Sequence, residues 1–152
     1  MRVSGHGVSV DLPSGWEGTI RGEPPVGVQG AAGGEWPTVA HLANFPLPAE
    51  RADFGGDVVE SMRVGDVFVV LFEYDSSSAE TALFAHEGVP RVAAADFHRD
   101  ALQHGVPGQS GLQRFFRVGR RAFCLYVVVG SHLDRADVVP QVIAVLDTLE
   151  LG

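Results

Sequence analysis

The chain contains no lysine, because all eleven of its basic residues are arginine. Schiff-base catalysis, the lysine of a phosphate-binding loop and the ATP-binding lysine of a protein kinase all depend on an ε-amine. The sequence therefore excludes these three classes of site.

Cysteine is almost absent as well. The single Cys124 has no partner for an intramolecular disulfide, and it lies within a run of apolar residues. A reactive thiol requires a polar, electropositive neighbourhood, which this run does not offer. We therefore expect Cys124 to be a small buried hydrophobic residue.

Positive charge is scarce and scattered. The formal net charge is −8, and Arg120-Arg121 is the only pair of adjacent basic residues. Nucleic acids and anionic membranes require clustered positive charge, so we expect no nucleic acid or anionic membrane as a partner. Arg120 and Arg121 are expected in a solvated hairpin turn, where they are candidates for contact with a partner.

Long apolar segments of the kind that cross a membrane are also missing. No window reaches that length without a charge or a turn signal, and the residues after Met1 lack the apolar region of a secretory leader. On this basis we expect a cytoplasmic protein.

Apolar residues are nevertheless abundant, at 45% of the chain, which predicts one domain over residues 1–152 with a sizeable core. The runs Val67–Tyr74 and Ala122–Val129 are almost uninterrupted, which predicts two central strands covered on both faces. Leu112–Val118 precedes the second run and is joined to it by a short turn, so the two predict an antiparallel hairpin.

Weaker patterns predict the remaining elements. Alternation over His6–Leu12 predicts a strand, and Trp16–Arg21 is expected to be the second arm of its hairpin. Ser77 and Glu80 form a capping-box pattern that predicts a helix after it. The other expected elements are a loop over Gly22–Trp36, a strand over Pro37–Phe45, helices over Gly56–Arg63 and Ala79–His86, a short strand over Val92–Phe97, and an undecided segment, at most one helical turn, over His98–His104.

The last helix has the clearest pattern. Asp137 is the expected N-cap, and Pro140 would fall in the first turn, where its missing N–H costs little. Val138, Val142 and Val145 share one apolar stripe, which must dock on the sheet. The predicted fold is α+β: one antiparallel sheet of about five to seven strands, with helices packed on its faces.

This order of elements resembles the PsbP-like family, and most closely its uncharacterised actinobacterial members. The residues that carry the resemblance are Leu12-Pro13-Ser14-Gly15-Trp16, the hairpin of Phe115-Phe116-Arg117-Val118 with Arg121-Ala122-Phe123, and the ending Leu146-Asp147-Thr148-Leu149. The resemblance implies an α/β/α sandwich. It also implies an accessory, partner-binding role without catalytic residues, and it assigns no functional residue.

Two patterns could carry chemistry. Asp96, His98 and Asp100 alternate, so on a strand they would present a metal-ligand set to one side, with His86 or His104 in reach. The alternative is a polar surface strip, and the chain has none of the compact patterns of known metal sites. We therefore expect no metal and no other cofactor.

Ser131 and His132 follow a central strand and invite comparison with a hydrolase. Adjacent residues of an extended chain point in opposite directions, so His132 is poorly placed to activate Ser131. The Gly-x-Ser-x-Gly motif is missing, and Gln109-Ser110-Gly111 matches only part of it. We expect Ser131 to turn the chain towards the last helix.

The candidates for partner contact are Trp36, Phe115 and the two turn arginines, because exposed aromatic and arginine side chains dominate protein interfaces. The leading hypothesis is a non-catalytic accessory or interaction module that binds another protein and either stays monomeric or forms a homo-oligomer. A second hypothesis is a carrier of a small apolar ligand, with a pocket between sheet and helix. Its expected lining is Phe68, Phe72, Phe84, Phe116 and Tyr126. A hydrolase or metal-dependent enzyme is the third.

Overall fold

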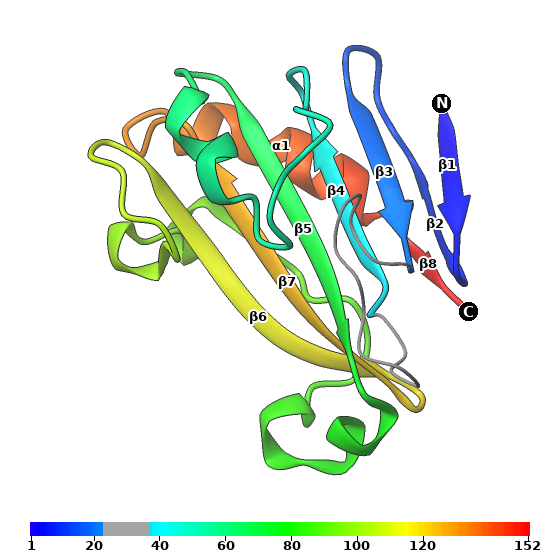
Figure 1. The fold of residues 1–152 in the computed structure, drawn as a ribbon. Coiled ribbons are helices and arrows are strands. Elements are labelled where there is room, and N and C mark those ends of the chain that lie inside the picture. Colours follow the sequence, from blue (N-terminus) through cyan, green and yellow to red (C-terminus); the bar gives the residue numbers. More distant parts are fainter. Residues whose placement is uncertain (23–36) are drawn as a thin grey trace.

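A computed structural model describes residues 1–22 and 37–152. Over these residues the fold is a mixture of β-sheet and helix (Figure 1). The predicted Gly22–Trp36 loop falls almost wholly outside the described residues, and the candidate contact residue Trp36 lies outside them. No helix among the described residues is long and apolar enough to cross a bilayer.

Five antiparallel strands form the larger sheet, in the order β3-β4-β5-β7-β6. They are β3 (Glu17–Arg21), β4 (Val39–Ala43), β5 (Val67–Tyr74), β6 (Ser110–Val118) and β7 (Arg121–Val129). The structure confirms that the two apolar runs are inner strands, paired with each other along their length, and that β6 and β7 form the predicted hairpin.

A smaller sheet contains the first and last strands, in the order β1-β2-β8. These strands are β1 (Arg2–Gly5), β2 (Val8–Asp11) and β8 (Glu150–Leu151). The hairpin predicted between His6–Leu12 and Trp16–Arg21 is therefore wrong. The partner of β2 is β1, through the two-residue turn His6-Gly7, in which both residues have positive φ (51° and 74°) as a type I′ turn requires.

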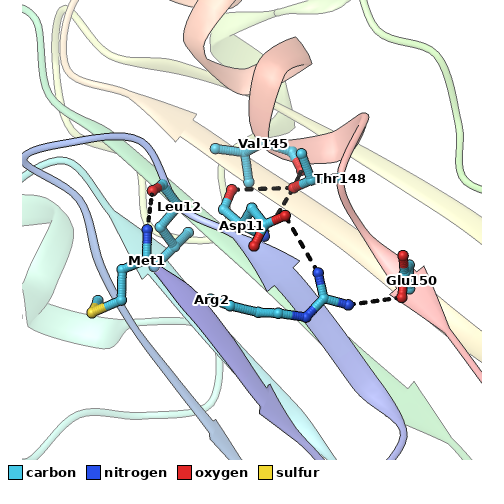
Figure 2. A network of polar contacts seen from close by, with 7 residues as sticks. All are labelled: Met1, Arg2, Asp11, Leu12, Val145, Thr148 and Glu150. Carbon is cyan, nitrogen blue, oxygen red and sulfur yellow. Dashed lines mark hydrogen bonds and ion pairs between the residues drawn. The ribbon is translucent and has the colours of Figure 1, made fainter.

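Polar contacts tie the smaller sheet to the end of the chain (Figure 2). The guanidinium of Arg2 reaches Asp11 at 3.3 Å and Glu150 at 2.8 Å. The hydroxyl of Thr148 accepts a hydrogen bond from the Asp11 N–H and lies 3.1 Å from the Asp11 carbonyl. The ammonium of Met1 donates to the carbonyl of Leu12. Residues far apart in the sequence are thus held side by side.

One α-helix, α1 (Arg135–Leu146), occurs among the described residues. Its buried valines and Leu146 belong to the same apolar cluster as residues of β5 and β7, and Figure 1 shows it running behind the larger sheet. Its N-cap is Asp134, not Asp137 as predicted, so Pro140 stands in the second turn instead of the first. The missing N–H of Pro140 deprives the carbonyl of Ala136 of its hydrogen bond within the helix. Because Pro140 and Ala136 are both exposed, water can bond this carbonyl instead.

The other helical segments are short 3-10 helices: η1 (Gly56–Ser61), η2 (Ser76–Glu80), η3 (Ala82–Phe84), η4 (Ala94–Asp96) and η5 (Arg99–Ala101). The predicted α-helix over Ala79–His86 is wrong, because Asp75 is the N-cap of η2 and Ser77 makes no capping bond. The predicted strand over Val92–Phe97 is also wrong, because the Asp96 carboxylate bonds the N–H of Ala93 and closes a turn.

Both faces of the larger sheet are covered, as the apolar runs predict. Every residue of Ala122–Val129 is buried. One face packs against α1, β2 and the segment 89–97. The opposite face is covered by η1 and by irregular segments that include Phe45, Phe54 and Leu102, so it lacks an α-helical layer within the described residues.

Candidate interaction surface

The segment that follows η3 runs along the outer side of β6. It begins beside the strand, where Arg117 bonds the backbones of His86 and Gly88, and it ends beside the strand, where His98 and Gly111 exchange two hydrogen bonds. Between these points it leaves β6, and Val92 and Phe97 pack into the core that α1 covers. We call residues 89–92 the ridge.

Two hollows border the ridge. The α1 hollow has a volume of about 420 Å³ and is lined by Val89, Pro90, Arg91, Val92, Ile143, Leu146 and Asp147. The β6 hollow has a volume of about 510 Å³ and is lined by His86, Glu87, Val89, Pro90, Arg91, Arg114 and Phe115. Because both hollows share three ridge residues, they form one continuous surface.

The surface combines accessible apolar side chains with charge. Ile143 is 38% exposed although it lies on α1. Phe115 is half-buried and packs edge-on against Phe84, with ring centroids 5.6 Å apart. Arg91 is exposed and forms no ion pair within the described part of the chain, whereas Arg114 lies 3.4 Å from Asp96. This mixture is typical of protein interfaces.

The two turn arginines have different surroundings. Arg121 donates two hydrogen bonds to Glu73, each of 2.8 Å, and three more to the carbonyls of His6, Gly7 and Gly152. These bonds use all five N–H groups of the guanidinium, and the hydrogen bonds to Glu73 raise its pKa. Arg121 is therefore an internal clamp.

Arg120, the neighbour of this clamp, is exposed in the turn. It lines a further hollow of about 550 Å³ together with Ser76, Ser77, Ala79, Glu80, Arg117 and Gly119. The predicted contact residues Phe115 and Arg120 thus border different hollows.

The candidate metal ligands are not brought together. Asp96 caps η4 and faces Arg114, while His98 and Asp100 belong to the next turn. Since these residues lie on 3-10 turns, the alternation expected of a strand does not apply. Over residues 1–22 and 37–152 no group of three His, Cys, Asp or Glu side chains is placed to hold a metal ion.

The candidate hydrolase pair also lacks a catalytic geometry. His132 uses its backbone to bond Gly108 and Arg135, and its Nδ1 is buried without a hydrogen-bond partner among the described residues. No hydrogen bond joins it to Ser131 within that part of the chain.

Burial raises the pKa of the Cys124 thiol to about 11, as expected for an inert core cysteine.

The aromatic residues predicted to line a carrier pocket are divided among three clusters. Phe116 belongs to the core under α1, Phe68 and Tyr126 to the opposite face, and Phe84 to a small cluster at the end of the sheet. Of the five, only Phe72 lines any of the four hollows described, in this case one of about 690 Å³ between Pro37 and Ser77.

Sequence reasoning missed a buried histidine on β4. His41 is 1% exposed, its Nε2 lies 2.6 Å from the carbonyl oxygen of Asp53, and its Nδ1 accepts a hydrogen bond from Arg51. Burial lowers its pKa to about 4, with a further decrease from the charges of Arg51 and Arg21. The imidazole is thus neutral and holds the segment after β4 against the sheet. Alternation along β4 identifies its face, but no pattern identifies its partners.

Comparisons with protein-family models, with curated proteins and with solved structures find no match for this chain.

Proposed function

We propose that this chain is a non-catalytic interaction module that binds another protein through the surface formed by the ridge and its two hollows. The observation that carries the proposal is the continuity of the two hollows, with Phe115 and Ile143 accessible beside them. Accessible apolar groups next to arginine are the composition that interfaces favour.

A PsbP-like α/β/α relationship, with its accessory role, agrees with this proposal. The hairpin of β6 and β7 followed by α1 supports it, although within residues 1–22 and 37–152 an α-helix covers one face of the larger sheet alone. The cytoplasmic location expected from the sequence stays a prediction, and the sequence leaves the choice between monomer and homo-oligomer open.

Affinity capture tests the proposed function. The full chain is immobilised and exposed to an extract of cells that produce it, alongside Ile143→Asp and the control Leu133→Asp. Leu133 is 81% exposed and does not line either hollow, so it receives the same change outside the surface. We expect a near-stoichiometric partner whose capture falls at least tenfold for Ile143→Asp only. Absence of such a partner, or equal capture by both variants, contradicts the proposal.

The alternatives have their own measurements. Native mass spectrometry of the freshly purified chain would reveal a co-purified small molecule if the chain is a carrier. Turnover on broad substrate panels that is lost in Ser131→Ala or His98→Ala would instead favour an enzyme.

A further inference from the structure

β6 is an edge strand of the larger sheet, and half of its backbone groups face away from β7. Its pairing with β7 runs without a bulge from Ser110 to Val118. Gly111 and Arg117 point outward, because Gly111 exchanges two hydrogen bonds with His98 and Arg117 bonds the backbones of His86 and Gly88. In an antiparallel strand alternate residues present N–H and C=O to the same side, so Gln113 and Phe115 also face outward.

The outward groups of these two residues are mostly unused. The carbonyl of Gln113 accepts a hydrogen bond of 3.1 Å from the Arg114 side chain. The N–H of Gln113 and both the N–H and the C=O of Phe115 have no hydrogen-bond partner within the described part of the chain. Three backbone groups thus form an open stretch of strand edge.

The two bridged positions limit what can pair with this edge. Gly111 and Arg117 are already bonded on their outer side, so a long strand such as β6 of a second copy cannot align along the edge. The stretch between them accommodates about three residues of an extended chain. Its size favours a short peptide segment.

The charge beside the open edge indicates the composition of that segment. The β6 hollow borders the edge, and it contains Arg91, which has no ionic partner among the described residues. Arg114 also lines this hollow, but it lies 3.4 Å from Asp96. Glu87 lies in the same hollow but is 3.4 Å from Arg117. In a chain of net charge −8 this is a local site for a carboxylate.

We propose that the open edge of β6 at Gln113–Phe115 binds a short acidic peptide segment of another protein by strand addition, with a carboxylate of the segment against Arg91. The proposal rests on the interaction function proposed above and names its partner chemistry. The added strand would accept hydrogen bonds from both free N–H groups and donate one to the Phe115 carbonyl.

Selection from a displayed library of random seven-residue peptides tests the proposal on the full chain. The most enriched peptide is then synthesised, and its affinity is measured for four variants. Gln113→Pro removes one outward N–H while the strand keeps its bonds to β7, and Gln113→Thr changes the side chain but keeps that N–H. Arg91→Glu reverses the charge in the β6 hollow. Arg63→Glu makes the same change at an exposed arginine that lies just before the start of β5.

We expect enriched peptides to carry an acidic residue among β-branched ones. Their affinity should fall at least tenfold for Gln113→Pro and Arg91→Glu and change less than twofold for the two controls. Bound peptide should slow amide exchange at Gln113 and Phe115. Arg91→Glu lies on the surface, so it remains informative even if Gln113→Pro does not fold.

Several results overturn the proposal. These are the absence of enrichment, binding that leaves the two amides unprotected, equal loss in Arg91→Glu and Arg63→Glu, and a dimer in solution that Gln113→Pro dissociates. Capture of a cellular partner that depends on Ile143 but not on Gln113 would reject strand addition and retain the interaction function.

Discussion

At the residue scale, two polar side chains, those of His41 and Arg121, hold separate segments of the chain together by hydrogen bonds. His41 receives a hydrogen bond from Arg51 and contacts the carbonyl of Asp53, so a single neutral tautomer satisfies both partners. Protonation would place an N–H donor against the guanidinium. The histidine thus couples an irregular segment to β4 only while it is uncharged.

This coupling predicts a loss of stability in acid. The folded-state pKa of His41, about 4, lies below its ordinary value of 6.5, so the unfolded chain binds more protons between these pH values. The free energy of unfolding therefore decreases as the pH falls from 6.5 to 4, by roughly 3 kcal/mol in total from this residue. Urea unfolding across this range should show the decrease in the parent chain and a shallower one in His41→Gln. His86→Gln, at an exposed histidine, is the control, and equal slopes in all three chains would reject the assignment.

Arg121 is the second of these residues, and its exposed neighbour Arg120 provides the comparison. Lysine cannot reproduce five fixed N–H donors, so Arg121→Lys should leave Glu73 and several carbonyls without partners. We expect a loss of about 1–3 kcal/mol in chemical denaturation. Arg120→Lys, one position earlier and exposed, should stay within about 0.5 kcal/mol of the parent. A loss of equal size in both variants would mean that the clamp contributes nothing specific.

At the scale of elements, sequence patterns succeeded where burial is continuous. Val67–Tyr74 and Ala122–Val129 were identified as inner strands because uninterrupted apolar runs have few other stable environments. The prediction of a helix over Ala79–His86 is wrong because the capping-box pattern is not followed by an apolar stripe at helical spacing. Leu83 is 58% exposed, and only Ala79 and Phe84 are buried, a spacing that matches no helical face.

The interaction surface was only partly accessible to sequence reasoning. Phe115 was identified from its aromatic side chain, but its role as an edge residue depends on strand order, which the sequence does not encode locally. Arg91 and Ile143 are 52 positions apart in sequence (143 − 91) and meet only because the ridge crosses to α1. Only the tertiary fold brings these two residues to the same hollow.

The end of β7 depends on a close approach that only glycine permits. A Cβ at Gly130 would lie 1.8 Å from the carbonyl oxygen of Arg63, in the turn that precedes β5. Gly130→Ala must therefore push this turn away, and we expect a destabilisation of about 1–3 kcal/mol in urea unfolding. Gly105→Ala is the matched control, since nothing lies within 4 Å of the added Cβ and its φ is not positive. Similar stability of the two variants would contradict the packing described.

At the scale of the whole molecule, two sheets of different size share one core. Val8 and Val10 of β2 pack with β5, β7 and α1, but the smaller sheet has short strands and exposed ion pairs. Exposed pairs of this kind contribute little to stability. The smaller sheet should consequently open more readily than the larger one.

Thr148 provides a test of this difference. Thr148→Val keeps the shape of the side chain but removes its hydrogen bonds to Asp11 and Val145. We expect amides between β1 and β2 to exchange with solvent about fivefold faster, which corresponds to about 1 kcal/mol, while amides between β5 and β7 keep their rates. Thr81→Val is the control, because within the described residues the Thr81 hydroxyl bonds the carbonyl of Ser78 alone. Uniform acceleration in both sheets would show that they open together.

The pairing of β2 with β8 also constrains how the chain is made. Arg2 and Glu150 are 148 positions apart, so the ribosome releases the hairpin of β1 and β2 long before its third strand is translated. The apolar side chains of Val8 and Val10 must wait until β5, β7 and α1 have been translated for their final cover. This delay leaves the nascent hairpin of β1 and β2 exposed until the elements that cover it have been translated.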